Sequence, residues 1–217
     1  ADKPLGVSIL LLMKDHLADM ERGFESIRDQ DYPGLVEIVY VDSGGTDGTV
    51  AFMRERGIEA HMILAEEFHH GRTRNLAASL ATHEILVTLS ADACPADGSW
   101  LSNLVQPFGD PEVDGVYGKQ VPLPAMGGLR RRAMEALYHD DHEVRVLDDG
   151  ETLSLSMLRF STANAAFRAS RWRVHPFREN GVVAEDHGLC FDILMAGKKV
   201  VYAPAAAVIH GHERNWW

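Results

Sequence analysis

The chain has 217 residues, of which 46% are hydrophobic and 24% charged, and it carries a net charge of −11. These values are typical of a soluble globular protein with one sizeable core, and no apolar run approaches the roughly 18 residues that a membrane-spanning helix needs. The negative charge excludes nucleic acid and anionic membrane as partners of the surface as a whole, so an anionic ligand would need a metal ion, arginines or a helix N-terminus.

Cysteine usage and the N-terminal stretch indicate the compartment. Cys94 and Cys190 are far apart in the sequence, which predicts two reduced thiols in a cytoplasmic protein. The stretch ADKPLGVSILLLM carries Asp2 and lacks a basic leader, so it predicts a first strand rather than a secretion signal. We expect a cytoplasmic protein that associates at most peripherally with the inner face of a membrane.

Strands and helices alternate in the first half of the chain. Apolar and β-branched runs predict strands at residues 7–13, 35–41, 58–64 and 85–89. Helical spacing of apolar residues predicts helices after Leu17, before Arg56 and over residues 72–82. This alternation at βαβ spacing predicts an α/β fold with a parallel sheet.

The order becomes irregular in the second half. We predict an amphipathic helix over residues 100–108, a strand at 113–119, a loop at 122–128 and a mixed-charge helix at 130–147. A strand at 163–168, a helix at 185–196 and a strand at 199–208 follow. One domain is expected, with its second half, from about residue 119, forming a smaller irregular lobe on the first sheet.

An acidic residue follows the buried strand at 85–89. The segment SADACP places Asp92 among small residues before Pro95. Open α/β sheets bind ligands at the carboxyl ends of their strands, which favours a ligand-binding carboxylate. The alternative is a turn aspartate that caps the helix beginning near Trp100.

The loop DSGGTDGT, which begins with Asp42, follows the second strand. Its glycines permit unusual backbone conformations, and it has neither the Gly-Lys-Ser/Thr of a P-loop nor a GxGxxG turn. One interpretation is a cradle for a nucleoside, in which Asp42 accepts a hydrogen bond from base or ribose. The other is a tight turn in which Thr46 or Asp47 caps the next helix.

The segment FHHGRTRN opens a helix with Arg72 and Arg74 in its first turns. Basic residues oppose the helix dipole there, so these two indicate an anionic ligand such as a phosphate. His69 and His70 suggest a metal, but adjacent loop histidines are more often solvated or hydrogen-bonded.

Two late segments carry further polar groups. Glu185 and Asp186 begin a helix, where acids suit the dipole, although one carboxylate could also act as a general base. His210 and His212 are two residues apart on a strand, so they share a face and suit one divalent metal. Asn164 and Trp172 are interpreted as packing or capping residues.

These stretches together resemble the family 2 glycosyltransferases with a GT-A fold, especially the rhamnosyltransferase-like branch. Matching blocks occur in order from about Val7 to His212, and they are VSILLLMKD, DSGGTDGT, FHHGRTRNLAASLATHEILVTLSADACP, NAAFR, AEDHG and VVYAPAAAVIHGH. The resemblance implies a Rossmann-like, mostly parallel sheet flanked by helices. It also implies a metal-dependent, inverting hexosyltransferase in polysaccharide synthesis, with a nucleotide-sugar half (residues 1–118) and an acceptor half (residues 119–217).

The resemblance also assigns roles to residues. It implies that Asp42 and Arg74 contact the nucleotide of a nucleotide-diphosphate sugar. Asp186 would be the catalytic base beside Glu185, which we place with the substrate-binding residues. The implied acceptor is a saccharide or a lipid-linked saccharide. The resemblance leaves the oligomeric state undetermined.

The expected metal is Mg²⁺ or Mn²⁺, held by Asp92 with His210 or His212. The family's DxD motif is Ser90-Ala91-Asp92 here, so one acid is missing. Ser90 can still hydrogen-bond a ribose, but the remaining coordination must come from elsewhere, and the late histidines are the first candidates.

Two other functions remain open at this stage. A sugar-nucleotide nucleotidyltransferase typically has a glycine-rich phosphate loop after the first strand, where this chain has Lys14-Asp15-His16-Leu17. A non-catalytic domain that binds a nucleotide or a partner is favoured only by the serine at position 90.

Overall fold

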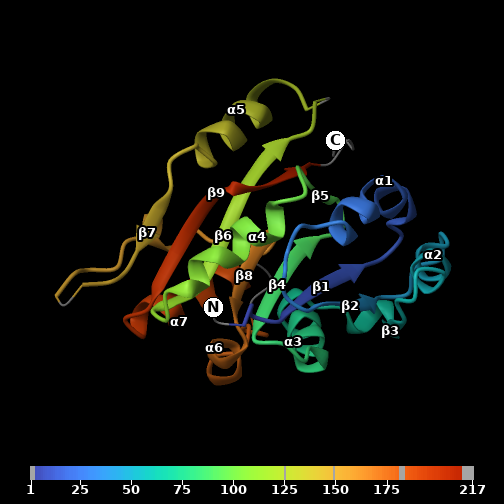
Figure 1. The fold of residues 1–217 in the computed structure, drawn as a ribbon, viewed down its shortest axis with the longest axis horizontal. Coiled ribbons are helices and arrows are strands. Elements are labelled where there is room, and N and C mark those ends of the chain that lie inside the picture. The colour runs from blue at the N-terminus through green and yellow to red at the C-terminus, as the bar shows by residue number, and fades with distance from the viewer. Residues whose placement is uncertain (1–2, 125, 149, 181–183, 212–217) are drawn as a thin grey trace.

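The central strands are apolar along their whole length because helices cover both faces of the sheet. In the computed structural model, which describes residues 3–124, 126–148, 150–180 and 184–211, nine strands form one sheet (Figure 1). The strands are β1 (Val7–Met13), β2 (Val36–Asp42), β3 (Ala60–Met62), β4 (Ile85–Ser90), β5 (Ala93–Pro95), β6 (Val113–Pro122), β7 (Glu143–Arg145), β8 (Asn164–Arg168) and β9 (Lys199–His210).

The connecting segments contain seven α-helices and three short 3-10 helices in the described ranges. The α-helices are α1 (Leu17–Arg28), α2 (Thr49–Arg54), α3 (His70–Leu80), α4 (Trp100–Val105), α5 (Gly128–Leu137), α6 (Ala169–Val174) and α7 (Glu185–Met195). The 3-10 helices are η1 (Ala65–Glu67), η2 (Gln106–Gly109) and η3 (Leu155–Leu158). None of the described helices combines the length and hydrophobicity that crossing a lipid bilayer requires.

The sheet is parallel in its first half and mixed in its second. Its order is β3-β2-β1-β4-β8-β6-β9-β5, with β7 also paired to β9. The pairs among β1 to β4 are parallel, as predicted. β8 then runs antiparallel to both β4 and β6, and β9 runs parallel to β6. The second half therefore continues the same sheet, so that β9 and α5 lie far from α2 and β3 (Figure 1).

Alternating side chains of the strands divide the core into two layers. Ile9 and Leu11 of β1 pack with α1 and α4, where Phe24 and Trp100 are fully buried. Leu10, between them, packs on the opposite face with α3 and α7. Because both faces are covered, β1 shows the continuous apolar pattern of a buried parallel strand.

One local prediction for the second half was wrong. The helix predicted over residues 130–147 ends at Leu137, and Glu143–Arg145 instead form β7 against β9. Arg145 donates to the carbonyls of Met157 and Arg159, a tertiary contact that helical periodicity does not reveal. Pro95, which follows Asp92 closely, lies in β5, a short strand at the sheet edge where a missing N–H is tolerated.

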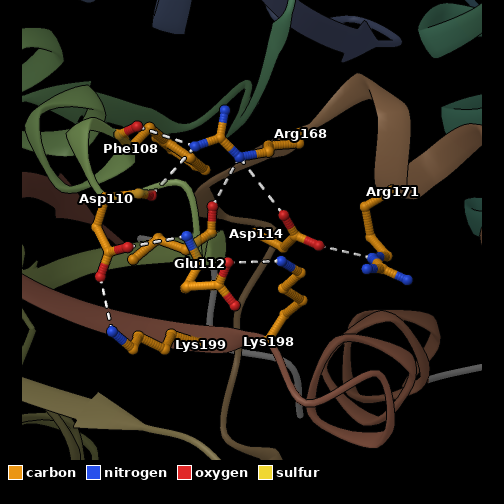
Figure 2. Close-up of polar contacts among 9 residues, drawn as sticks. Phe108, Asp110, Glu112, Asp114, Arg168, Arg171, Lys198 and Lys199 are labelled. Carbon is orange, nitrogen blue, oxygen red and sulfur yellow. Dashed lines mark hydrogen bonds and ion pairs between the residues drawn. The ribbon is translucent and has the colours of Figure 1, made fainter.

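A buried carboxylate joins the ends of β6 and β8 that lie furthest from the cleft described below. Asp114 has a side chain only 7% exposed, and it pairs with Arg171 at 2.7 Å and with Arg168 at 3.4 Å (Figure 2). Arg168 also donates to the carbonyls of Phe108 and Asp110 at 2.9 and 3.2 Å. Removing one partner of such a buried ion pair leaves the other charge buried without a counter-charge, which is costly. This contact therefore holds the ends of β6 and β8 together.

An irregularity in β9 fixes the opposite ends of these strands. Gly118 pairs with Ala203 and Gln120 with Val208, so β9 advances by five residues while β6 advances by two. The extra residues, 204–207, cross directly over Gly118, where a Cβ atom would lie 2.0 Å from the carbonyl oxygen of Ala206. Only glycine permits this crossing.

Asn164 satisfies the backbone groups that the irregularity leaves without ladder partners. Its side chain is fully buried, and its amide nitrogen donates to Lys119 O at 3.1 Å and Ala206 O at 2.8 Å. Its oxygen accepts from Trp100 Nε1 at 2.9 Å. Because buried backbone carbonyls need partners, this one amide makes the bulge of residues 204–207 tolerable.

We predict that Gly118→Ala lowers the free energy of unfolding by about 3 kcal/mol or more, because the added methyl group overlaps backbone that cannot move away. The control is Gly109→Ala, where nothing lies within 4 Å of the added carbon and the change should stay within about 1 kcal/mol. Urea unfolding of both variants tests this, and equal midpoints would contradict the close crossing.

Candidate functional site

A cleft of about 540 Å³ opens where the carboxyl ends of β1 and β4 meet the end of β9. We call it the main cleft. Its polar lining includes His16, His70, Arg74, Ser90, Asp92 and His210. The carboxyl ends of parallel strands are where α/β sheets bind ligands, so this is the leading candidate site.

The structure brings together Asp92 and His210, two of the three predicted metal ligands. Ala93, which follows Asp92, pairs with His210 across β5 and β9. The distance from His210 Nε2 to Asp92 Oδ1 is 3.2 Å, and the two side chains are 16% and 12% exposed. The other ring nitrogen of His210, Nδ1, lies 2.7 Å from Gln120 Oε1. His212, the third predicted ligand, lies outside the described residues.

This pair can contribute to a divalent-cation site but does not complete one. Among the described residues, no three His, Cys, Asp or Glu side chains converge on one point. Ligands on adjacent sites of an octahedral cation lie about 3 Å apart when each bond is about 2.1 Å. The Asp92–His210 distance of 3.2 Å suits two such ligands of one cation, and a carboxylate and an imidazole are suitable donors for Mn²⁺.

Glu185 holds Arg74 in the site. Both were predicted to bind substrate, and they are distant in sequence. Arg74 Nη1 donates to Glu185 Oε1, and the side chains are only 14% and 10% exposed. Burial lowers the pKa of Arg74, and the charges of Glu185 and Asp186 oppose that effect. Arg74 therefore keeps a fixed position and a compensating charge at the wall of the main cleft.

Asp42 stabilises the loop after β2 through hydrogen bonds of its buried carboxylate. Its side chain is fully buried, and its carboxylate accepts from Gly45 N at 2.7 Å and from the Tyr40 hydroxyl. The pKa of Tyr40 is raised mainly by burial and also by its hydrogen bond to Asp42. The neighbouring Ser43 lines the main cleft, whereas Asp42 is not among the lining residues. Its contact with a nucleobase stays a prediction.

The main cleft continues into two smaller spaces. A groove of about 270 Å³, the connecting groove, shares His70, Arg74, Ser90 and Thr162 with the main cleft and extends to Glu185 and Asp186. A cavity of about 520 Å³, the side cavity, lies between α5, η3 and the start of α7 and is lined by Tyr138, Ser161 and Asp186. Ser90 thus lines both the main cleft and the connecting groove, and Asp186 lines both the connecting groove and the side cavity.

The backbone at the start of α7 is strained where it presents these acids. Ala184 has φ 70° and ψ 27°, a left-handed conformation that non-glycine residues rarely adopt. Asp186 is half-buried, and its Oδ1 accepts from His187 N at 2.8 Å. Strain of this kind is often retained at functional sites, because the geometry that it produces is needed there.

Two histidines of the main cleft were not assigned to a site from the sequence. A hydrogen bond with Asp19, at 2.8 Å from Nδ1, raises the pKa of His16. His70 behaves oppositely, because burial and then the charge of Arg74 lower its pKa. The adjacent pair His69-His70 was the available signal, since only His70 lines the main cleft, while His69 caps α3.

Gln120 and Asn164 were also missed. The strand predicted at 113–119 stopped just before Gln120, and Asn164 was interpreted as a packing residue. The available signal was an amide side chain at the end of a predicted strand or within it, because a buried amide must find partners.

Comparisons with known proteins place the chain among sugar-transferring enzymes. The model of the family described as "Glycosyl transferase family 2" matches residues 8–168. An O-antigen chain rhamnosyltransferase of Salmonella typhimurium, RfbN, is 32% identical over 180 residues, which cover 82% of this chain and 57% of that relative. A pre-mycofactocin glycosyltransferase of Mycobacterium tuberculosis is 26% identical over 97% of this chain and 44% of its own length. The chain thus spans about half the length of these relatives.

Solved structures show the same fold at low sequence identity. A mannosyltransferase from Pyrobaculum calidifontis, in complex with GDP-Man and Mn²⁺, has a TM-score of 0.74 and 24% identity, covering 100% of this chain and 59% of its own. TarS of Staphylococcus aureus in complex with UDP-GlcNAc has a TM-score of 0.74 and 16% identity, covering 98% and 60%.

The Arg74–Glu185 pair gives a prediction about stability. Glu185→Gln removes the carboxylate beside a buried guanidinium, so the free energy of unfolding should fall by about 3 kcal/mol. The control is Glu59→Gln, because Glu59 is 76% exposed and pairs with an Arg54 that is 62% exposed, and loss of such a pair should cost less than about 0.5 kcal/mol. Urea unfolding would contradict the assignment if the two variants lost the same stability.

Proposed function

The chain belongs to glycosyl transferase family 2 and has the GT-A fold, and from this premise we propose that it transfers a hexose from a nucleoside-diphosphate sugar to a hydroxyl acceptor. The observation that carries the proposal is the series of three spaces with shared lining residues, from the Asp92–His210 pair in the main cleft, by the connecting groove, to Asp186 at the side cavity. A donor and an acceptor can meet along such a series of spaces. The rhamnosyltransferase relatives favour rhamnose as the sugar and cell-surface polysaccharide as the product.

The donor occupies the main cleft in this proposal. The loop that Asp42 supports would face the nucleoside, with Asp42 reaching it only by a rearrangement of that loop, and Arg74 would meet the nucleotide phosphates with its fixed guanidinium. Ser90 can hydrogen-bond the ribose. This arrangement assigns residues 1–118 mainly to the donor and residues 119–217 mainly to the acceptor, with Arg74 and Glu185 joining the two parts across the connecting groove.

Asp92 and His210 are the residues that would hold Mg²⁺ or Mn²⁺, with His212 as a further candidate from the sequence. A divalent cation there would neutralise charge that develops on the departing diphosphate. The described residues supply one carboxylate and one imidazole, so further ligands would come from His212 or from oxygens of the donor and of water.

Asp186 is the proposed general base. Its carboxylate takes the proton of the acceptor hydroxyl while that oxygen forms a bond to the anomeric carbon. The bond from the anomeric carbon to the diphosphate oxygen breaks, and its electron pair leaves with the diphosphate. Attack from the face opposite the diphosphate inverts the configuration. One carboxylate suffices, in contrast to glycoside hydrolysis, where two flank the sugar.

The acceptor approaches from the side cavity. Tyr138, Ser161 and Asp186 give this cavity polar walls, and Leu137 and Leu155 give it apolar ones. A saccharide could bind the polar groups, and a lipid-linked saccharide could also use the apolar ones. The O-antigen relatives support a saccharide acceptor, but they are longer than this chain, so their acceptors are carried over as a proposal.

We predict that Asp186→Asn lowers the rate of sugar transfer about 10²- to 10⁴-fold, because the amide cannot accept the proton. The assay measures nucleoside diphosphate released from dTDP-, UDP- and GDP-sugars with water as acceptor. Binding of the nucleoside diphosphate, measured by calorimetry, should be unchanged.

The control for this variant is Asp192→Asn on the same helix, α7, where Asp192 pairs with the half-exposed Arg178 and lines none of the three spaces. Its rate should equal that of the wild type. Full activity of Asp186→Asn would refute the base assignment, and nucleotide binding without any turnover by the wild type would favour a non-catalytic binding domain.

Donor class and metal dependence can be measured together by thermal unfolding with UDP, dTDP or GDP, each in MnCl₂ or EDTA. One base should raise the melting temperature by about 5 °C at a concentration 100 times its Kd, and only with Mn²⁺. Asp92→Asn should abolish that response to Mn²⁺. A chain that responds to no nucleotide under either condition would contradict the donor-site assignment.

A further inference from the structure

Gln120 connects the side cavity with the main cleft through its amide group. It lies on β6, is only 4% exposed, and contacts three other parts of the chain. Its Nε2 donates to the Tyr138 hydroxyl at 2.6 Å and to Ser161 Oγ at 2.8 Å. Its Oε1 lies 2.7 Å from His210 Nδ1. Both amide hydrogens and the carbonyl oxygen therefore have partners.

The orientation of this amide determines which nitrogen of His210 carries hydrogen. A carbonyl oxygen can only accept, so the nitrogen that faces it, Nδ1, must be the donor. The second nitrogen, Nε2, faces Asp92 Oδ1 at 3.2 Å. A carboxylate oxygen also only accepts, so without a cation Nε2 can carry hydrogen as well, and Nε2 offers its lone pair beside Asp92 only when that hydrogen has left.

We propose that Gln120 is a positioning residue that fixes the Nδ1–H tautomer and the ring orientation of His210. The ring then presents Nε2, together with Asp92, to a divalent cation. The role of the cation rests on the proposed function, whereas the assignment of the tautomer rests on the hydrogen bonds alone. Groups that orient a metal-binding imidazole through its other nitrogen typically change metal affinity 10- to 100-fold.

The position of Gln120 follows from the irregularity in β9. After the bulge of residues 204–207, Gln120 pairs with Val208, and His210 is two residues further along the same face. Diagonal neighbours of this kind are within reach of long side chains. The hydroxyls of Tyr138 and Ser161 contact the Nε2 end of the amide, and its carbonyl end contacts His210.

The first experiment reads the tautomer directly, in the full chain without metal. We would label the histidines with ¹⁵N and record long-range ¹H–¹⁵N spectra in EDTA, using His210→Gln to assign the ring. Nδ1 of His210 should carry hydrogen in the wild type, whether or not Nε2 also does. A ring with a bare Nδ1 and hydrogen on Nε2, donating to Asp92, would overturn the proposal.

Two substitutions of Gln120 distinguish the effect of its hydrogen-bond acceptor from the effect of its side-chain volume. Gln120→Met keeps the approximate volume but removes the acceptor, so the hydrogen should shift toward Nε2, where Asp92 accepts it. Gln120→Glu keeps an acceptor at Nδ1, so hydrogen on Nδ1 should be retained. Identical spectra for the Met variant and the wild type would overturn the proposal.

The second experiment measures the affinity for Mn²⁺ alone by electron paramagnetic resonance. Gln120→Met should bind Mn²⁺ about 10- to 100-fold more weakly than the wild type, and Gln120→Glu should bind it at least as tightly as the wild type. The matched control is Gln30→Met, because Gln30 bonds to Leu101 N, Ser26 O and Asp97 O far from the cleft. That variant loses a bridging amide but should bind Mn²⁺ as the wild type does.

The two experiments distinguish failure of this proposal from failure of the proposed function. If the wild type does not bind Mn²⁺ but Gln120 still controls the hydrogen on Nδ1, the metal part of the function fails and the tautomer assignment stands. If Gln120→Met binds Mn²⁺ as tightly as the wild type, the positioning role is overturned while the proposed function is untouched.

Discussion

The candidate site depends on one close contact between strands, the crossing of β9 over Gly118. Residues 204–207 of β9 bulge across β6, and Asn164 provides hydrogen bonds for the carbonyls on both strands. The absence of a side chain at position 118 lets the strands approach, and the buried amide makes the approach stable. Beyond the crossing, the last residues of β9 reach β5, so that His210 lies between Gln120 and Asp92. Without the crossing, the imidazole would not meet the carboxylate.

The same site shows how an acidic protein can receive an anionic ligand. The chain carries a net charge of −11, yet Arg74 is held at the cleft by a buried pair with Glu185. Ser90 replaces a second acid beside Asp92, which reduces the negative charge there and also the number of charged metal ligands. In the proposed metal site, the imidazole of His210 would add a nitrogen ligand that brings no negative charge. The local electrostatics are therefore set by a few fixed partners rather than by the composition of the surface.

The order of the three spaces accounts for the proposed chemistry. In the proposed function the donor occupies the main cleft, and Asp186, the proposed base, lines both the connecting groove and the side cavity. The left-handed Ala184 turns the chain into α7 just before the two acids. Gln120 adds a physical connection between the two ends of this series, because Tyr138 and Ser161 line the side cavity and His210 lines the main cleft.

The sequence by itself determined the parallel half of the sheet and the blocks that show the family, because apolar periodicity and strand-end motifs are local patterns. It also singled out Asp92 and His210, although their meeting required the structure. Only the tertiary structure decided that residues 143–145 form a strand instead of extending a helix, that Asp42 is buried beneath its loop, and that Gln120 and Asn164 carry hydrogen bonds essential to the site. The reason is physical, because strands and buried amides find their partners in distant parts of the chain. No local pattern shows which backbone groups will need a hydrogen-bond partner from a side chain.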